Sequence, residues 1–138
     1  MSTKYAQYCW PDSFPEGVPE DLDVMPAEGR VYRLVRNIPP TPKDFLMHRM
    51  ENPDRRYSTD QVPMSYGVSF WTKLSKIQKV KRNYPKPEQF GTSIVVSGNL
   101  CNELGVIPKE VASDGHVTLW AQDGAEPHLY VNTQEDEL

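Results

Sequence analysis

Cysteines and long hydrophobic runs are scarce in this sequence. Cys9 and Cys101 are the only two cysteines in 138 residues, whereas small secreted domains are usually held together by several disulfides. No apolar run approaches the roughly 20 residues that a membrane-spanning helix needs, and residues 1–14 lack the apolar core of a secretory signal. We therefore expect reduced thiols, a cytoplasmic protein and no membrane partner.

Motifs for metal, nucleotide and nucleic-acid binding are also missing. The sequence contains neither a P-loop nor the G-x-G-x-x-G pattern, in which glycines bring backbone N–H groups close to phosphates. The cysteines and the three histidines lack the close spacing of zinc ligands. Cys101 has no neighbour that would activate its thiol, so we expect a small buried residue rather than a nucleophile paired with His116. We expect neither a metal site nor a resident cofactor.

Proline is abundant, and the first part of the chain has no regular hydrophobic period. The 13 prolines are about twice the average usage of roughly 5%. Residues 1–29 contain four aromatic residues, which are Tyr5, Tyr8, Trp10 and Phe14. We expect this irregular arm to pack on the domain or to dock on a partner, because solvated segments contain few aromatics. The expected division is an arm at 1–29, an α+β domain at 30–133 and an acidic tail at 134–138.

Charge is segregated along the chain. Residues 30–87 contain 13 basic and four acidic residues, a balance of +9, and the two ends contain two basic and 15 acidic residues, a balance of −13. A basic middle attracts phosphates and acidic surfaces. The alternative is that the acidic ends lie over the basic middle of the same chain.

The most informative stretch is GVSFWTKLSKIQKVKRNYPK at 67–86. The apolar run at 68–71 predicts a buried strand. Thr72 is the predicted N-cap of a helix that follows, and Tyr84-Pro85 is its predicted end, because a residue before proline avoids the α region. The helix has a narrow apolar stripe and a basic remainder.

Four further strands are predicted at 30–36, 90–98, 116–122 and 128–131. Thr41, Pro42 and Asp44 have the properties of the first turn of a helix, which ends at Asn52-Pro53. Residues 54–65 are expected to form a loop, and 99–108 a helical turn or loop. The predicted fold class is α+β: a single compact domain with a mixed sheet of about five strands, two main helices and the irregular proline-rich arm.

Basic and aromatic residues supply the candidate sites. The candidate anion-binding residues are Arg33, Arg36, Lys73, Lys76, Lys79 and Arg82. Arginine suits bidentate binding of phosphate or carboxylate, and the alternative is that these side chains are simply solvated. The candidate pocket residues are Tyr66, His116 and Trp120. For His116 and Trp120 the alternative is a histidine satisfied at a sheet end and a tryptophan in the core.

Two resemblances are visible. The segments VYRLVR, PPTPKDF, GVSFWT and GHVTLWA together resemble a small bacterial family of unassigned function. An arginine on an early strand, followed by a Gly-x-Ser-aromatic strand that runs into a helix, is similar to ADP-ribosyltransferase-like toxins, including the RES-domain group. That resemblance implies that the strands of Arg33 and Ser69 hold NAD, and it makes these two residues the candidate catalytic residues. It also implies a late glutamate that acts on the ribose, for which the sequence offers only Glu126 and the tail acids.

Three functions follow as hypotheses. The first is an accessory or interaction protein whose basic middle binds a nucleic acid or an acidic protein surface, in a bacterial defence or toxin–antitoxin setting that rests on the family resemblance. The second is an NAD-using enzyme of the ADP-ribosyltransferase-like class. The third is a structural subunit held in a larger complex by its aromatic arm.

Overall fold

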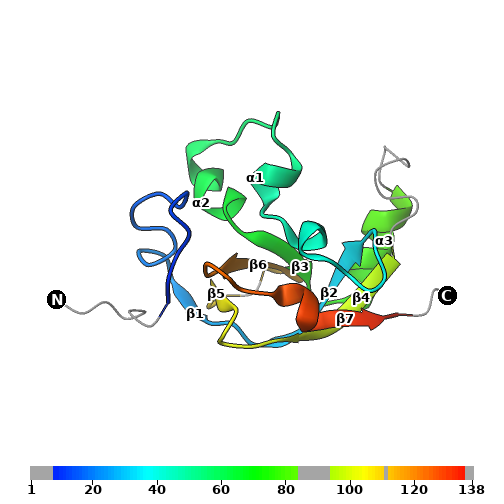
Figure 1. Cartoon of the computed structure of the whole chain (residues 1–138). Helices are drawn as coiled ribbons and strands as arrows, with labels where there is room; N and C mark the ends of the chain where they lie inside the picture. Colours follow the sequence, from blue (N-terminus) through cyan, green and yellow to red (C-terminus); the bar gives the residue numbers. More distant parts are fainter. Residues whose placement is uncertain (1–7, 84–93, 111, 136–138) are drawn as a thin grey trace.

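Seven strands form one antiparallel sheet in the part of the chain that the computed structural model describes, which is residues 8–83, 94–110 and 112–135. In spatial order they are β1 (Val24–Pro26), β5 (Gly105–Pro108), β6 (His116–Ala121), β3 (Val68–Trp71), β2 (Gly29–Val35), β4 (Ile94–Leu100) and β7 (Val131–Gln134). The sheet curls into an open half-barrel, with short helices along its surface (Figure 1). The α+β class is confirmed at this level.

The predicted mixed sheet of about five strands is wrong in its strand direction and in its number of strands, which is seven. Every pairing between neighbouring strands is antiparallel. The two strands that the sequence did not reveal, β1 and β5, pair with each other. β1 contains Pro26 and lies at a sheet edge, where a proline without an N–H is tolerated. Its three residues are too few to show a period.

Four of the predicted strands are confirmed, and two other predictions fail. β2, β3 and β6 lie where the sequence placed strands, and β4 coincides with the strand predicted at 90–98, of which residues 90–93 lie outside the described part. The predicted turn or loop at 99–108 contains the end of β4 and all of β5 instead. Gly105 begins β5, and a Cβ there would lie 2.0 Å from the carbonyl oxygen of Trp120, so this glycine permits the close contact between the strands. At 128–131 a 3-10 turn, η3 (Pro127–Leu129), precedes β7.

The helices are shorter than predicted. The helix expected at 41–52 is two separate turns, η1 (Pro42–Phe45) and α1 (His48–Glu51), because Leu46 and Met47 have extended backbones. The loop expected at 54–65 contains η2 (Thr59–Gln61) and α2 (Val62–Ser65). Among the described residues, only α3 (Leu74–Asn83) is longer than four residues. The prediction of two main helices is therefore wrong.

The basic helix α3 forms as predicted, except at its start. It begins at Leu74, and the Thr72 hydroxyl donates a hydrogen bond to the Gly115 carbonyl instead of capping the helix. The prediction of an N-cap at Thr72 is thus wrong, because the nearby β6 entry supplies a tertiary partner. The helix ends at Asn83, and the predicted stop at Tyr84-Pro85 lies outside the described residues. α3 packs on β2 and β3.

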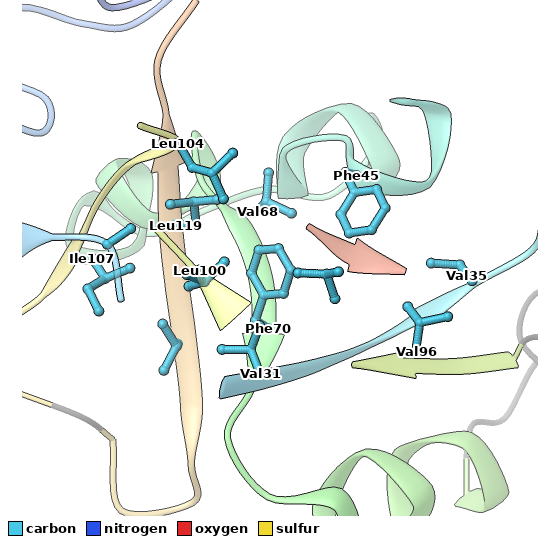
Figure 2. Packing of buried hydrophobic residues seen from close by; sticks show 13 residues of the cluster. Val31, Val35, Phe45, Val68, Phe70, Val96, Leu100, Leu104, Ile107 and Leu119 are labelled. Atoms are coloured by element: carbon cyan, nitrogen blue, oxygen red, sulfur yellow. The ribbon is translucent and has the colours of Figure 1, made fainter. Parts of the chain in front are cut away.

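The core lies on one face of the sheet. Alternate residues of β3 and β6 point into it, with Val68, Phe70 and Leu119 at most 4% exposed. Figure 2 shows these side chains packed with Phe45 of η1 and with valines of β2 and β4. A strand with one face buried has a fixed register, because a shift by one residue would expose the apolar set. The other face of β3 and β6 is therefore fixed as the face that carries polar residues.

The N-terminal arm packs internally. Trp10 and Phe14 contact a buried cluster that includes Tyr8 and Trp120. The Trp10 and Phe14 rings are stacked with centroids 6.1 Å apart, and Phe14 meets Tyr66 edge-on at 5.8 Å. This part of the arm is bound to its own domain, while Tyr5 lies outside the described residues.

Candidate functional site

The sheet splits between β2 and β3. These strands pair at one position only, Tyr32 with Trp71, whereas β2 and β4 pair along seven residues. The Arg33 guanidinium bridges the split strands, and its Nη1 donates a 2.6 Å hydrogen bond to the Ser69 carbonyl oxygen. Arg33, Ser69 and Trp71, which lie at the split, line one cleft.

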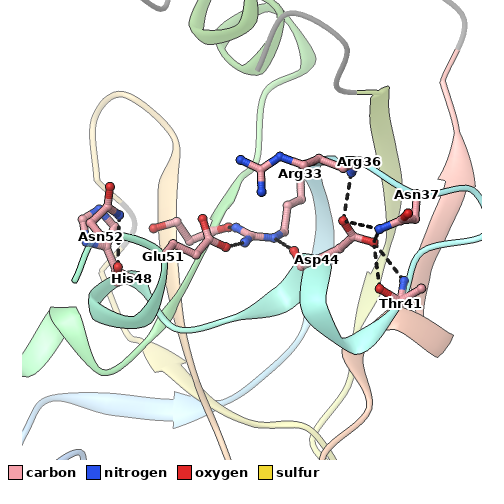
Figure 3. A network of polar contacts seen from close by, with 9 residues as sticks. Arg33, Arg36, Asn37, Thr41, Asp44, His48, Glu51 and Asn52 are labelled. Carbon is pink, nitrogen blue, oxygen red and sulfur yellow. Dashed lines mark hydrogen bonds and ion pairs between the residues drawn. The ribbon is translucent and has the colours of Figure 1, made fainter. Parts of the chain in front are cut away.

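Arg33 is the centre of a polar network (Figure 3). Its Nε donates to the Asp44 carbonyl oxygen at 2.8 Å, and its Nη2 forms an ion pair with Glu51. The guanidinium also lies 5.5 Å and 5.8 Å from the ring centroids of Phe45 and Phe70. Burial lowers the pKa of Arg33 from its ordinary value, and the Glu51 carboxylate opposes this shift. Arg33 therefore connects β2 to η1, α1 and β3.

The Asp44 side chain fixes the start of η1 beside this network. Its carboxylate accepts hydrogen bonds from the backbone N–H groups of Arg36 at 2.8 Å and Thr41 at 2.9 Å, and from the Asn37 amide. Burial raises the pKa of this carboxyl, but the hydrogen bonds together outweigh burial and leave the pKa below its usual value. The carboxylate therefore remains ionised and holds the turn after β2.

A cleft with two lobes lies where the sheet splits. One lobe, of about 220 Å³, is lined on its outer side by Tyr57, Gln61 and Met64. The other, of about 260 Å³, is lined by Leu34 and Trp71 and by Ile77 and Val80 of α3. Four residues line both lobes and form what we call the waist of the cleft: His48, Arg55, Ser69 and His116. The lining therefore combines apolar side chains with convergent polar groups, as small-molecule sites do.

Strand register brings the waist residues together. Ser69 lies opposite Thr118, and Trp71 lies opposite His116, across the β3–β6 ladder. These residues alternate with the buried residues of both strands, so they share the face away from the core. The Trp71 and His116 rings meet edge-on, with centroids 5.0 Å apart. His48 comes to the waist from α1, where its backbone N–H donates to the Gly67 carbonyl oxygen at 2.8 Å.

Both waist histidines favour the neutral form. Burial lowers the pKa of His48, and the nearby positive charge of Arg55 lowers it further. Burial also lowers the pKa of His116, against the opposing effect of Asp114. His48 Nδ1 lies 2.6 Å from the Tyr57 hydroxyl. A neutral imidazole can accept a proton, and His116 is the candidate general base of the waist, because both ring nitrogens of His48 contact Tyr57 and Arg55.

The structure separates the predicted site residues. Arg33, Ser69 and His116 line the cleft. Trp120 is 2% exposed in the core, with its indole N–H bonded to the Pro63 carbonyl oxygen. Tyr66 contacts Arg49 and lines a different, shallow hollow beside the arm.

The remaining basic candidates lie outside the cleft lining. The backbone N–H of Arg36 is held by Asp44. Lys73, just before α3, and Lys79 on α3 are exposed, Lys76 on α3 is half-buried, and none of the three pairs with an acid among the described residues. The side chain of Arg82 lies outside the part of the chain that is described.

Several cleft residues were not predicted from the sequence. His48, Arg55 and Tyr57 come from short turns that have no hydrophobic period, and Glu51 follows on the same turn as His48. The one available signal was the spacing of His48 and Glu51, which puts them on the same side of a helical turn. The late-glutamate candidate Glu126 does not line the cleft, and Glu135 bonds to Ser97 and Arg30 instead.

Comparisons with family models, with curated proteins and with solved structures found no match. No helix of the described residues is long and apolar enough to cross a membrane. In the same residues, no group of three or more His, Cys, Asp or Glu side chains could hold a metal ion. Cys9 is exposed, Cys101 is half-buried, and neither forms a disulfide. The fold and the cleft therefore carry the functional argument.

Proposed function

We propose that the cleft binds a nucleotide of the NAD type and that the chain is an NAD-using enzyme of the ADP-ribosyltransferase-like class. The observation that carries this proposal is the convergence of Arg33 and Ser69 on one cleft. The two residues are 36 positions apart in sequence and come from neighbouring strands. The resemblance implies that these two strands hold NAD.

The composition of the cleft supports this choice. Two lobes of about 220 and 260 Å³ are each large enough for a planar ring, and the polar waist between them would lie beside the ribose and phosphates.

In the proposed reaction, the bond between the ribose C1′ and nicotinamide breaks, and nicotinamide leaves with the electron pair. An acceptor nucleophile or water bonds to C1′ and gives its proton to the neutral imidazole of His116.

The chain departs from the family pattern in its acidic residue. Glu51 is the carboxylate that lines the cleft among the described residues, and it comes from α1 rather than from a late strand. Its ion pair with Arg33 holds it at the cleft, which Ser69 also lines. We assign to Glu51 the contact with the ribose hydroxyls that the resemblance gives to a late glutamate.

The test is release of nicotinamide from labelled NAD, together with transfer of label to proteins of a cell extract. We expect Ser69→Ala to lower either rate at least tenfold, while Ser75→Ala, on the exposed side of α3, leaves it unchanged. If the unaltered protein neither releases nicotinamide nor labels any protein, the proposal is wrong.

A second candidate function is polyanion or acidic-surface binding by α3. It is favoured by Lys73, Lys76 and Lys79, which pair with no acid of the described chain. Counterion release would make such binding fall steeply with salt. Lys76→Glu with Lys79→Glu should then weaken binding to single-stranded DNA or RNA at least tenfold at low salt. An unchanged affinity for both would exclude this function.

A further inference from the structure

Two residues of the turn at 53–58 contact the two nitrogens of one histidine. The Tyr57 hydroxyl lies 2.6 Å from His48 Nδ1, and Arg55 Nη1 lies 3.5 Å from His48 Nε2. The Arg55 guanidinium also lies 5.3 Å from the centroid of the Tyr57 ring. All three side chains line the lobe of about 220 Å³.

The directions of these hydrogen bonds follow from the chemistry of the groups. A guanidinium only donates, so His48 Nε2 must accept the bond from Arg55. A neutral imidazole then carries its proton on Nδ1 and donates it to the Tyr57 oxygen. The Tyr57 hydroxyl proton is left free to donate into the lobe. The lowered pKa of His48 agrees with this neutral form.

The charge of the cleft lining also favours an anion. Arg33 and Glu51 neutralise each other in their ion pair. Arg55 is exposed, and it forms no ion pair with any carboxylate of the described residues. The lobe therefore holds one uncompensated cation and one neutral O–H donor, both fixed by the same histidine. Charged and neutral donors side by side are the usual partners of phosphate oxygens.

We propose that Arg55 and Tyr57, held by His48, form a phosphate-binding subsite that takes the phosphate of a nucleotide. The assignment to a nucleotide rests on the proposed function, whereas the preference for phosphate rests on this geometry alone. Arg55 supplies the charge, Tyr57 supplies the second hydrogen bond, and His48 is a positioning residue.

The test is calorimetric titration of the full chain with AMP, adenosine, inorganic phosphate and a single-stranded oligonucleotide. Arg56 is an exposed neighbour that does not line either lobe, so Arg56→Gln is the matched control for Arg55→Gln. We expect AMP to bind more tightly than adenosine. Arg55→Gln should weaken AMP binding about tenfold or more, and Tyr57→Phe about threefold to tenfold. Adenosine binding should not change in either variant, nor AMP binding in Arg56→Gln.

The proposal is overturned if AMP binds no better than adenosine, or if the two arginine variants weaken AMP binding equally. Oligonucleotide binding that is tighter than AMP binding and depends on Arg55 would overturn the assignment to a nucleotide. Circular dichroism melting of each variant checks that it is folded. If the protein releases nicotinamide but binds AMP no better than adenosine, the phosphate subsite is wrong and the proposed enzyme stands. If it prefers AMP but releases no nicotinamide, the proposed enzyme is wrong and the subsite stands.

Discussion

Replacing Arg33 by methionine should destabilise the fold strongly. Methionine preserves the aliphatic packing against Phe45 and Phe70 but removes every donor of the guanidinium. The carbonyl oxygens of Asp44 and Ser69 then lose their hydrogen bonds, and Glu51 loses its ion-pair partner. Since the Arg33 side chain is only 9% exposed, water cannot reach all the groups that it leaves behind.

The magnitude follows from these three losses. Removing one partner of a buried ion pair typically costs about 3–5 kcal/mol, but the Glu51 side chain is 30% exposed and regains part of its hydration. Each unsatisfied carbonyl adds about 1 kcal/mol. We expect a total of about 3 kcal/mol, which for a chain of this size lowers Tm by about 10 °C.

Chemical denaturation with urea, followed by circular dichroism, measures this loss. Arg56→Met is the control, because Arg56 is exposed and should change stability by less than about 0.5 kcal/mol. A double-mutant cycle with Glu51→Gln should give a coupling energy of about 1 kcal/mol or more. If Arg33→Met is as stable as the unaltered protein but no longer binds NAD, Arg33 serves the ligand rather than the fold, and our account of the network is wrong.

Three further predictions concern stability. Gly98→Ala should lower the free energy of unfolding by about 3 kcal/mol in urea denaturation, because its Cβ would lie 2.0 Å from the Tyr130 carbonyl oxygen. Gly124→Ala is the control: it has open space but φ +80, so it should lower stability by only about 1 kcal/mol. Equal losses in the two variants would refute this reasoning. Phe70→Ala, at 0% exposure, should lower stability by about 3–5 kcal/mol, and a loss below about 1 kcal/mol would contradict the assigned core. His48 and His116 have lowered pKa values, so the stability they contribute is complete above about pH 6.5 and falls as pH drops below it; urea titrations should show a shallower decline in His48→Gln, and an unchanged decline would exclude this cause.

Elements with a clear hydrophobic pattern could be predicted from the sequence. β2, β6 and α3 are long enough for their periods to show, and the four residues of β3 lie in one apolar run. Their positions hold within one or two residues of the predicted bounds. β1 and β5, with three and four residues, could not be predicted. They form because β1 pairs with β5, and β5 also pairs with β6. A short strand that forms because it pairs with a segment distant in sequence shows no hydrophobic period of its own.

In the candidate site, residues on predicted strands could be recognised from the sequence, whereas residues on short turns could not. Arg33 and Ser69 stood out because they lie on strands that the sequence predicts, and His116 because it begins one. His48, Arg55 and Tyr57 are brought to the cleft by single turns, and only the three-dimensional path of residues 46–61 makes them neighbours of Ser69. The predicted helix at 41–52 failed for a related reason: Asp44 bonds back to Arg36, and His48 bonds forward to Gly67.

The most direct test of the central claim is an NMR titration of the labelled protein with NAD. We expect the largest backbone shift changes at the waist of the cleft, in Ser69, His116 and Arg55, with saturation as the site fills. Changes confined to the Lys73–Lys79 face of α3, or no saturable change at all, would contradict the account that the split in the sheet is a nucleotide site.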